Sequence, residues 1–372
     1  MDGKELALAA IEGRPARGIP AWEANIMEHR MIDRLAGLPE GSYVREPEAA
    51  YMAMQRALSC CMVDQQLWDN PLSMRQDGYG PETARGATTG AAEIVLDGMR
   101  IGSPEAVAAH IEAHLLPQRQ AELAAFDAEA WAGWVAEGER AAQERLGQDI
   151  LKAPYGWAGF PVFRYGLYGY EHYFSAWALY PEVIEREMSL TADLCALRNA
   201  ATARAIVENG LPPYIRLDFD LADSRGTLAS PESLDRIWLP HFARAVAPLA
   251  RSPVRMVWHC DGNLMALAPR LLEAGVKGFQ GFQYEDGMDY EAICRMKARD
   301  GDDLLIIGGV SVTRTLPFGR PADVARELSW LVRHGPRNRL FLGVSSSVAP
   351  GAPWENLQAL AQGLRHYREG GR

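Results

Sequence analysis

The sequence predicts an α/β fold built on a parallel β-sheet, in the form of either an α/β barrel or a doubly wound sheet. Strand and helix patterns alternate five times between residues 213 and 367. The strand segments are continuous apolar runs, which are typical of parallel strands buried on both faces. No stretch rich in Gly, Ser or Pro divides the 372 residues. Regular alternation over this length favours one domain with a single sheet.

The second half of the chain carries the regular strand–helix units. Strands are predicted at residues 213–219, 254–259, 277–283, 304–310 and 340–344. Helices are predicted from residue 230 and at 264–273, 290–298, 321–334 and 354–367. Ser230 is a favourable N-cap with Pro231 at the first helical position, and Gly275 is a natural helix stop.

The first half of the chain is less regular. Apolar runs at 19–22 and 60–64 predict the first two strands, and a further strand is expected near 160–164. Residues 92–101 are typical of a small hairpin with Asp97-Gly98 at its turn. Residues 103–150 and 181–209 are expected to be helical, the first with a solvated face.

Charge and cysteine content exclude several classes of protein. The net charge of −10 argues against a chain-wide attraction to nucleic acid or anionic lipid. The five scattered cysteines do not form a disulfide framework and suit free thiols in a reducing cytosol. The sequence shows neither a signal peptide nor a membrane span. We therefore expect a cytoplasmic protein that binds neither nucleic acid nor a membrane.

Polar side chains follow the ends of the predicted strands, and in a barrel these positions meet at one mouth. They are Asp218 and Asp220; His259 and Asp261; Gln283 and Glu285; Gly308, Gly309 and Arg314; and Ser345, Ser346 and Ser347. The densest group, at residues 257–263, places an imidazole, a thiol and a carboxylate within three residues. Such a group suits metal binding or acid–base catalysis.

Each of these residues also has a structural alternative. His259 could be a hydrogen-bonded structural histidine, and Asp261 could cap the following helix. Glu285 could belong to a plain polar loop, and Cys260 is a typical buried apolar side chain. Asp218 and Asp220 share one side of their strand and either perform acid–base work or brace neighbouring loops.

Several short segments recur in a characteristic order along the chain. They are residues 17–20, 168–171, 180–182, Asp220 with 226–232, 259–263, 308–310 and 353–356. Their order and spacing resemble the uroporphyrinogen decarboxylase superfamily over nearly the whole chain. The resemblance implies a (β/α)8 TIM barrel, here with extra N-terminal helices and a small hairpin. It implies one domain over 1–372, elaborated in 1–160 and regular in 161–372.

The superfamily contains two kinds of enzyme, and the resemblance is greater to one of them. The porphyrinogen decarboxylases carry Met-Arg-Gln-Ala-Gly-Arg-Tyr after the first strand, where this chain has residues 22–27, Trp-Glu-Ala-Asn-Ile-Met. Porphyrinogen decarboxylation is therefore not expected. Cytosolic methyltransferases of the same superfamily move methyl groups between a corrinoid on a partner protein and a thiol, amine or methoxy compound. Many of them hold zinc through His-x-Cys and a late Cys.

This chain replaces the thiolate ligands implied by that resemblance. Asp261 stands at the second position of His-x-Cys, and serines 345–347 stand at the late cysteine. Cys260 is one residue early and, by strand alternation, is expected to point away from His259. We therefore predict a site of His259, Asp261 and Glu285, completed by water or substrate. One nitrogen and two carboxylates suit zinc, and also iron or manganese.

The resemblance and these residues together predict a metal-assisted methyltransferase. It would move a methyl group between a small methoxylated or methylated compound and a corrinoid protein, with Asp220 and His259 as catalytic residues. The predicted substrate pocket comprises Trp22, Asn25, Tyr168, Gln283, Arg314 and Ser346. Two alternatives stay open, a decarboxylase or lyase of a small organic acid and a non-catalytic binding homologue. A homodimer is compatible with the methyltransferase and with both alternatives.

Overall fold

The computed structural model describes residues 1–65 and 94–370, and its centre is one sheet of eight parallel strands. The strands are β1 (Ala21–Trp22), β2 (Cys60–Val63), β5 (Leu151–Lys152), β6 (Tyr214–Asp218), β9 (Arg255–His259), β10 (Gly278–Gln280), β11 (Leu305–Val310) and β12 (Leu340–Val344). Neighbours in the sheet are consecutive along the chain, and β1 pairs with the last strand, β12. One bridge, between Tyr155 and Arg216, joins the remaining two ends beside β5 and β6. The predicted α/β barrel is confirmed.

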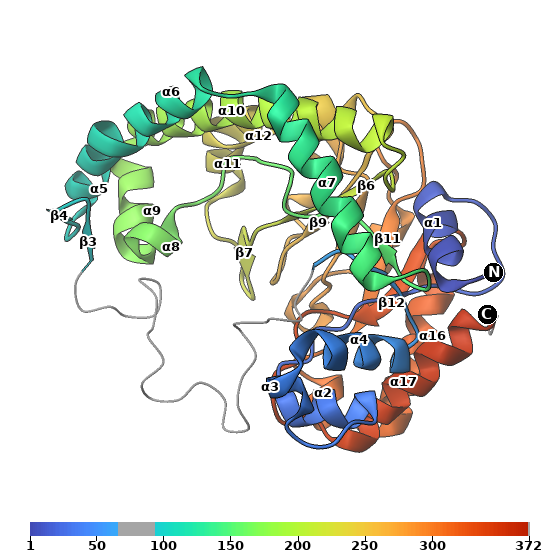
Figure 1. Ribbon diagram of the computed structural model, residues 1–372. Helices are drawn as coiled ribbons and strands as arrows, with labels where there is room; N and C mark the ends of the chain where they lie inside the picture. Colours follow the sequence, from blue (N-terminus) through green and yellow to red (C-terminus); the bar gives the residue numbers. More distant parts are fainter. Residues whose placement is uncertain (66–93, 371–372) are drawn as a thin grey trace.

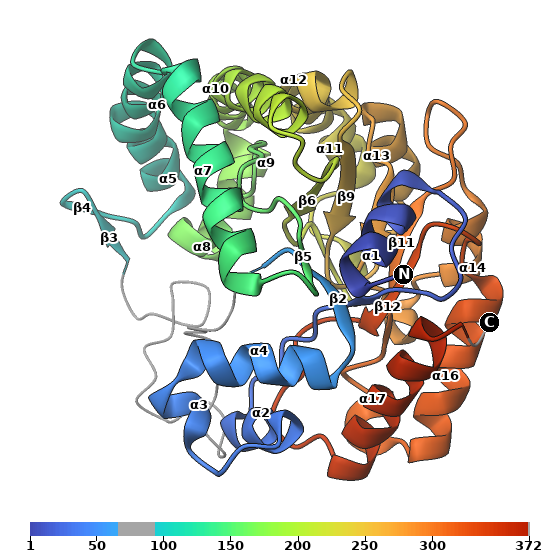
Figure 2. The same cartoon turned by 45° about the vertical axis from the view of Figure 1, so that its right-hand side comes forward.

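Helices surround the strands (Figures 1 and 2). The helices of the barrel wall are α2 (His29–Ala36), α3 (Ser42–Arg45), α4 (Pro47–Ala57), α10 (Pro181–Glu208), α11 (Pro231–Ile237), α12 (Leu239–Ala250), α13 (Ala268–Ala274), α14 (Tyr290–Arg295), α15 (Thr315–Phe318), α16 (Pro321–His334) and α17 (Trp354–Arg368). The long helix expected over 181–209 and the helices expected over 321–334 and 354–367 are confirmed. Ser230 caps α11 as predicted, by accepting a hydrogen bond from the Ser233 N–H.

The additional N-terminal elements lie between β2 and α10. They are the hairpin β3 (Val95–Leu96) and β4 (Met99–Arg100), the helices α5 (Pro104–His110), α6 (Leu116–Ala124), α7 (Ala128–Leu146), α8 (Tyr165–Tyr168) and α9 (Tyr170–Leu179), and the π-helical turn η2 (Ile111–Leu115). The predicted hairpin is confirmed from residue 94 onward, and its residues 92–93 lie outside the described part. A second hairpin, β7 (Ala222–Asp223) and β8 (Gly226–Thr227), follows β6.

The strand expected near 160–164 is wrong, because that segment packs outside the sheet. Phe160 lies edge-on to Phe242, with ring centroids 5.8 Å apart. The Pro161 carbonyl accepts a hydrogen bond of 2.8 Å from the Trp238 indole. The third strand is instead Leu151–Lys152, directly after α7, where a lysine interrupts the apolar pattern.

The interior of the barrel is a packed core closed at its amino-terminal end by α1 (Gly3–Glu12). Side chains from seven of the eight strands fill it, and the apolar face of α1 packs against them. The largest contributors are Trp22, Met62, Tyr214, Val257, Phe341, Leu6 and Ile11. Because α1 covers the amino-terminal end, the carboxyl ends of the strands form the open mouth.

Among the described residues, no helix is long and apolar enough to span a bilayer.

Gly309 of β11 marks a place where two strands approach too closely for any side chain. A Cβ at this position would collide with the Val344 carbonyl carbon and the Ser345 nitrogen of the next strand. We expect Gly309→Ala to lower the free energy of unfolding by about 2 kcal/mol or more, through overpacking. Gly133→Ala in α7, where a Cβ meets nothing within 4 Å, should raise it by about 0.5–1 kcal/mol. Urea unfolding followed by circular dichroism measures both, and equal stability of the two variants would contradict the argument.

Candidate active site

A polar cavity of about 170 Å³ opens at the mouth of the barrel, at the carboxyl ends of the strands. Its lining residues come from six strands or the loops that follow them. They are Trp22, Asn25, Gln65, Arg216, Asp218, His259, Gln280, Ser346 and Ser347. A cavity of about 150 Å³ is large enough for benzene, so this one suits a ligand of similar size.

Three side chains beside this cavity converge as a candidate metal site. Asp220, His259 and Asp261 each offer one ligand atom, and these atoms all lie within 4.8 Å of one another. Asp220 follows β6, whereas His259 ends β9 and Asp261 follows it. Neighbouring parallel strands therefore bring residues 39 or more positions apart to one edge of the sheet.

The triad retains buried atoms without partners among the described residues. His259 Nδ1 and Asp261 Oδ1 are both buried and make no hydrogen bond. The other oxygen, Asp261 Oδ2, accepts a hydrogen bond of 3.2 Å from the Ser346 hydroxyl. Buried polar atoms normally have partners, and one nitrogen with two carboxylates is a common donor set for a catalytic divalent metal. The residues present therefore fit a metal ion.

Electrostatics at Asp261 are consistent with this fit. Burial raises the pKa of its carboxyl group. His259 opposes this rise, whereas the carboxylates of Asp220 and Asp218 add to it. A bound cation would favour the ionised form and relieve the repulsion between the carboxylates.

Asp218 belongs to the cavity and is held from behind by three donors. Its Oδ2 accepts hydrogen bonds from Arg216 Nη1 at 2.9 Å and from the Tyr155 hydroxyl at 3.0 Å. The Gln65 amide contributes a third at 3.3 Å. Its other oxygen, Oδ1, lies 3.9 Å from His259 Nε2. Because the three donors hold Oδ2, the other oxygen faces the imidazole of His259.

Arg216 is the centre of a buried charge network below the cavity. Its guanidinium forms a two-pronged ion pair with Asp64, at 2.8 and 3.0 Å. Burial raises the pKa of Asp64, but the Arg216 charge and hydrogen bonds from its neighbours outweigh this and lower it to about 2. The guanidinium also lies over the Tyr155 and Trp22 rings, 4.6 and 5.3 Å from their centroids.

Glu23 completes the network as a buried acid. Burial raises its pKa well above the usual range, and the neighbouring Asp64 carboxylate raises it further. Its Oε1 accepts hydrogen bonds from the backbone N–H groups of Asp64 and Gln65, at 3.0 and 2.7 Å. The Tyr51 hydroxyl donates to Oε2 at 2.8 Å.

Cys260 is buried and turned away from the triad, as alternation predicts. Its sulfur lies within hydrogen-bond distance of the Leu221 N–H and the Asp261 carbonyl. Burial raises the pKa of the thiol far above its ordinary value. A neutral buried thiol is inert, since the thiolate is the nucleophile and the metal ligand.

Four of the predicted pocket residues lie at or beside the cavity. Trp22 and Asn25 line it, and the Asn25 amide donates to the Ser347 hydroxyl at 2.8 Å. Ser346 lines it and contacts Asp261. Gln283 holds the loop that follows β9, because its Oε1 accepts a hydrogen bond of 2.6 Å from the Gly262 N–H. The room for the His259 ring comes from Gly281, where φ is +81° and a Cβ would lie 2.7 Å from Nδ1.

Three predicted residues lie elsewhere. Glu285 does not join His259 and Asp261, because its carboxylate turns outward to the hydroxyls of Ser311 and Thr313. Arg314 lies with it in a separate hollow against α16. Tyr168 is completely buried and bonds to His110 Nδ1 at 2.9 Å, so it braces α5 rather than the mouth. In the metal group, Asp220 takes the place expected for Glu285.

Several residues of the site were not selected from the sequence. Arg216 could have been found, because a charge within an otherwise apolar strand needs a buried partner. Glu23 and Asp64 each follow a strand and could have been found by the same rule as Asp218. Tyr155 follows β5, the strand whose position was misassigned. Gln280 lies within an apolar run, and its unpartnered Oε1 is a property of the tertiary structure alone.

A family model and a solved methyltransferase agree with this architecture. The family model described as uroporphyrinogen decarboxylase (URO-D) matches residues 95–367. A solved methyltransferase from Methanosarcina mazei aligns over 99% of this chain and 99% of its own, with 18% identity and a TM-score of 0.58. That likeness shows the fold. A B12-independent methionine synthase from Shewanella sp. W3-18-1 aligns over 63% and 67%, with 13% identity and a TM-score of 0.40. No curated protein matches the sequence.

The raised pKa of Glu23 predicts a particular dependence of stability on pH. A carboxyl group whose pKa is higher in the folded than in the unfolded protein stabilises the folded state below the unfolded pKa of about 4.3. This stabilisation is lost as the pH rises toward the pKa of the folded state. Glu23→Gln removes the titrating group and keeps an acceptor for the backbone N–H groups. We expect its stability relative to wild type to rise between pH 5 and 8, by at most about 1.4 kcal/mol per pH unit.

Urea unfolding at several pH values measures this difference. Glu137→Gln, which makes the same substitution on the exposed side of α7, is the control and should follow the wild-type curve. Parallel curves for Glu23→Gln and wild type would show that Glu23 is ionised in the folded protein.

Proposed function

Because the chain belongs to the uroporphyrinogen decarboxylase family, we propose that it is a methyltransferase with its active site at the barrel mouth. It moves a methyl group between a small methoxylated or methylated compound and a corrinoid carried by a separate protein. The observation that supports this most directly is the convergence of Asp220, His259 and Asp261 beside a cavity of benzene size.

A divalent metal, with zinc as the first candidate, would be held by Asp220, His259 and Asp261 and would supply Lewis acidity to a substrate oxygen or sulfur. Removal of a methyl group from an ether leaves an alkoxide or phenolate, which is a poor leaving group unless its charge is neutralised. Three protein ligands leave coordination positions for the substrate, as in other catalytic metal sites.

The other residues bind and orient the substrate. Asp218 Oδ1 and Gln280 Oε1 are hydrogen-bond acceptors at the cavity wall, and the other polar atom of each side chain is hydrogen-bonded. Trp22 provides an apolar wall. A carrier protein would present its corrinoid at the open mouth of the barrel, so that the methyl group passes over a short distance.

One prediction concerns metal binding. It distinguishes a site that includes Asp220 from the site that includes Glu285, which the sequence predicts. We expect the protein to bind one equivalent of Zn²⁺ or Co²⁺, and His259→Ala and Asp261→Asn to weaken this affinity at least about tenfold. Glu285→Gln, a matched carboxylate control outside the triad, should bind metal as wild type does. Titration calorimetry and the visible absorption of the Co²⁺ form measure it. If Glu285→Gln were the one variant that lost metal binding, the triad would be wrong and Glu285 would be a metal ligand, as the sequence predicts.

The second prediction concerns the reaction itself. With a corrinoid carrier reduced to cobalt(I) and a panel of small methoxyaromatics, we expect methylcobalt(III) to form. Its absorption spectrum measures the reaction. The His259→Ala variant should be slower by at least about 100-fold, since the leaving group loses its stabilisation. If cobalt is never methylated while the folded protein still binds metal, the methyltransferase proposal fails. Retained binding of an aromatic acid without metal would instead favour the decarboxylase or lyase alternative.

A further inference from the structure

The cavity at the mouth of the barrel carries an excess of negative charge. Arg216 supplies the one lysine or arginine charge among its described lining residues. The carboxylates at this cavity and beside it are those of Asp64, Asp218, Asp220 and Asp261. With His259 neutral, four carboxylates against one guanidinium leave three negative charges, and an ionised Glu23 would add a fourth. A divalent metal at the candidate site lowers this excess to one negative charge and does not reverse its sign.

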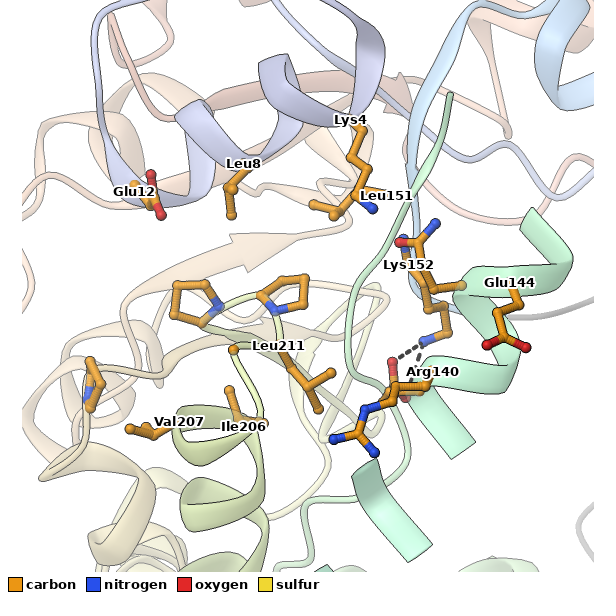
Figure 3. A pocket seen from close by; sticks show the side chains of 16 residues that line it. Lys4, Leu8, Glu12, Arg140, Glu144, Leu151, Lys152, Ile206, Val207 and Leu211 are labelled. Atoms are coloured by element: carbon orange, nitrogen blue, oxygen red, sulfur yellow. Dashed lines mark hydrogen bonds and ion pairs between the residues drawn. The ribbon is translucent and has the colours of Figure 1, made fainter. Parts of the chain in front are cut away.

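A cavity at the opposite face of the barrel has no such excess. This cavity, of about 600 Å³, lies between α1, the last turns of α7 and the end of α10 (Figure 3). Its lining contains three cations and three carboxylates, which are Lys4, Arg140 and Lys152 with Glu12, Glu139 and Glu144. The excess at the mouth is therefore a local property of that site, and it favours a ligand with positive charge.

Strand register places a hydrogen-bond acceptor on either side of His259. Asp218 of β6 and Gln280 of β10 are both register partners of His259 in β9. Neighbouring strands lie about 4.8 Å apart, and all three side chains line the cavity. Asp218 Oδ1 lies 3.9 Å from His259 Nε2. Because the cavity is close to the size of benzene, a ligand that fills it contacts this whole row.

The Gln280 amide is held so that its oxygen is the free atom. Its Nε2 donates a hydrogen bond of 3.3 Å to the Ser345 carbonyl, which the amide oxygen cannot do. Oε1 is buried and has no partner in the described part of the chain, whereas buried acceptors normally have a donor. The unpartnered donor in the lining is the Trp22 indole N–H. An anion would therefore meet one neutral donor and a guanidinium that Asp64 and Asp218 already engage.

We propose that the methyl donor of this site is a small ether or thioether that also carries an ammonium group, of the 2-methoxyethylamine type. The inference rests on the proposed function for the methyl group and on the cavity for the charge. The ammonium donates hydrogen bonds to Asp218 Oδ1 and Gln280 Oε1, and the methyl-bearing oxygen or sulfur lies toward His259 and the metal site. Its positive charge offsets the negative charge that remains when a metal is bound. A carboxylate at the same place is repelled.

Four probes of nearly equal size test the charge preference. They share a methoxy group and are 2-methoxyethylamine, which is protonated at pH 7 as alkylamines are, 2-methoxyethanol, 1,2-dimethoxyethane and methoxyacetate. Ligand-observed NMR titration of the full chain at pH 7, with one equivalent of Zn²⁺ and without metal, measures their affinities. We expect saturable binding of 2-methoxyethylamine, at least about tenfold tighter than that of 1,2-dimethoxyethane. The alcohol should bind with intermediate affinity and methoxyacetate most weakly.

Variants of the two acceptors separate recognition from a structural role. Asp218→Asn replaces an acceptor beside His259 with a neutral amide, and should weaken 2-methoxyethylamine about tenfold while strengthening methoxyacetate. Gln280→Met keeps the length of the side chain and removes the acceptor, so it should weaken the amine about threefold and leave 1,2-dimethoxyethane unchanged. Asp149→Asn, at an exposed position ahead of β5, is the matched control and should bind all four probes as wild type does.

The inference is overturned if methoxyacetate binds wild type as tightly as 2-methoxyethylamine, if none of the four probes binds saturably, or if both acceptor variants keep the wild-type affinities. Its failure can be told apart from failure of the proposed function. Methylation of cobalt(I) by methoxyaromatics, together with probes that bind without charge preference, would overturn this inference and leave the methyltransferase standing. A charge preference without methylation of cobalt(I) by any probe would support the ligand class and contradict the methyltransferase.

Discussion

The buried ion pair between Arg216 and Asp64 is the interaction on which the mouth of the barrel depends. A guanidinium with almost no exposed surface is tolerable only when carboxylates and aromatic faces replace its water. Asp64 provides two parallel contacts, Asp218 a third, and the Tyr155 and Trp22 rings lie against it. The same residue forms the bridge that joins the two ends of the sheet. Arg216 therefore contributes both to the closure of the barrel and to the geometry of the site.

This arrangement also divides the carboxylates of the mouth into two groups. Asp218 is engaged by Arg216, Tyr155 and Gln65, and its oxygens are oriented by them. Asp220 and Asp261 have no arginine or lysine partner among residues 1–65 and 94–370, and they lie with His259. Because Arg216 already neutralises the first group, only the second offers a place for a cation from outside. This separation supports the proposed metal site at Asp220, His259 and Asp261.

The sequence was a good guide to the barrel and a partial guide to its site. Five strand–helix units could be read from residue 213 onward, because each strand is a long apolar run bounded by turn residues. The third strand was missed, because it has two residues and one of them is Lys152. His259 and Asp261 were found by their position after a strand. Glu285 satisfies the same rule and points away, because hydroxyl groups of the next loop bind its carboxylate.

Local pattern by itself therefore determined the α/β class, most of the strands along the chain and the edge at which polar residues gather, whereas the family resemblance selected the barrel over a doubly wound sheet. These depend on the period of apolar residues and on capping residues, which act over a few positions. The tertiary structure decided which of the gathered side chains meet. Asp220 joins the triad from a neighbouring strand, whereas Tyr168 lies in the core with its hydroxyl hydrogen-bonded to His110. Such choices depend on strand register and on competing hydrogen bonds between residues far apart in the chain, which no local pattern records.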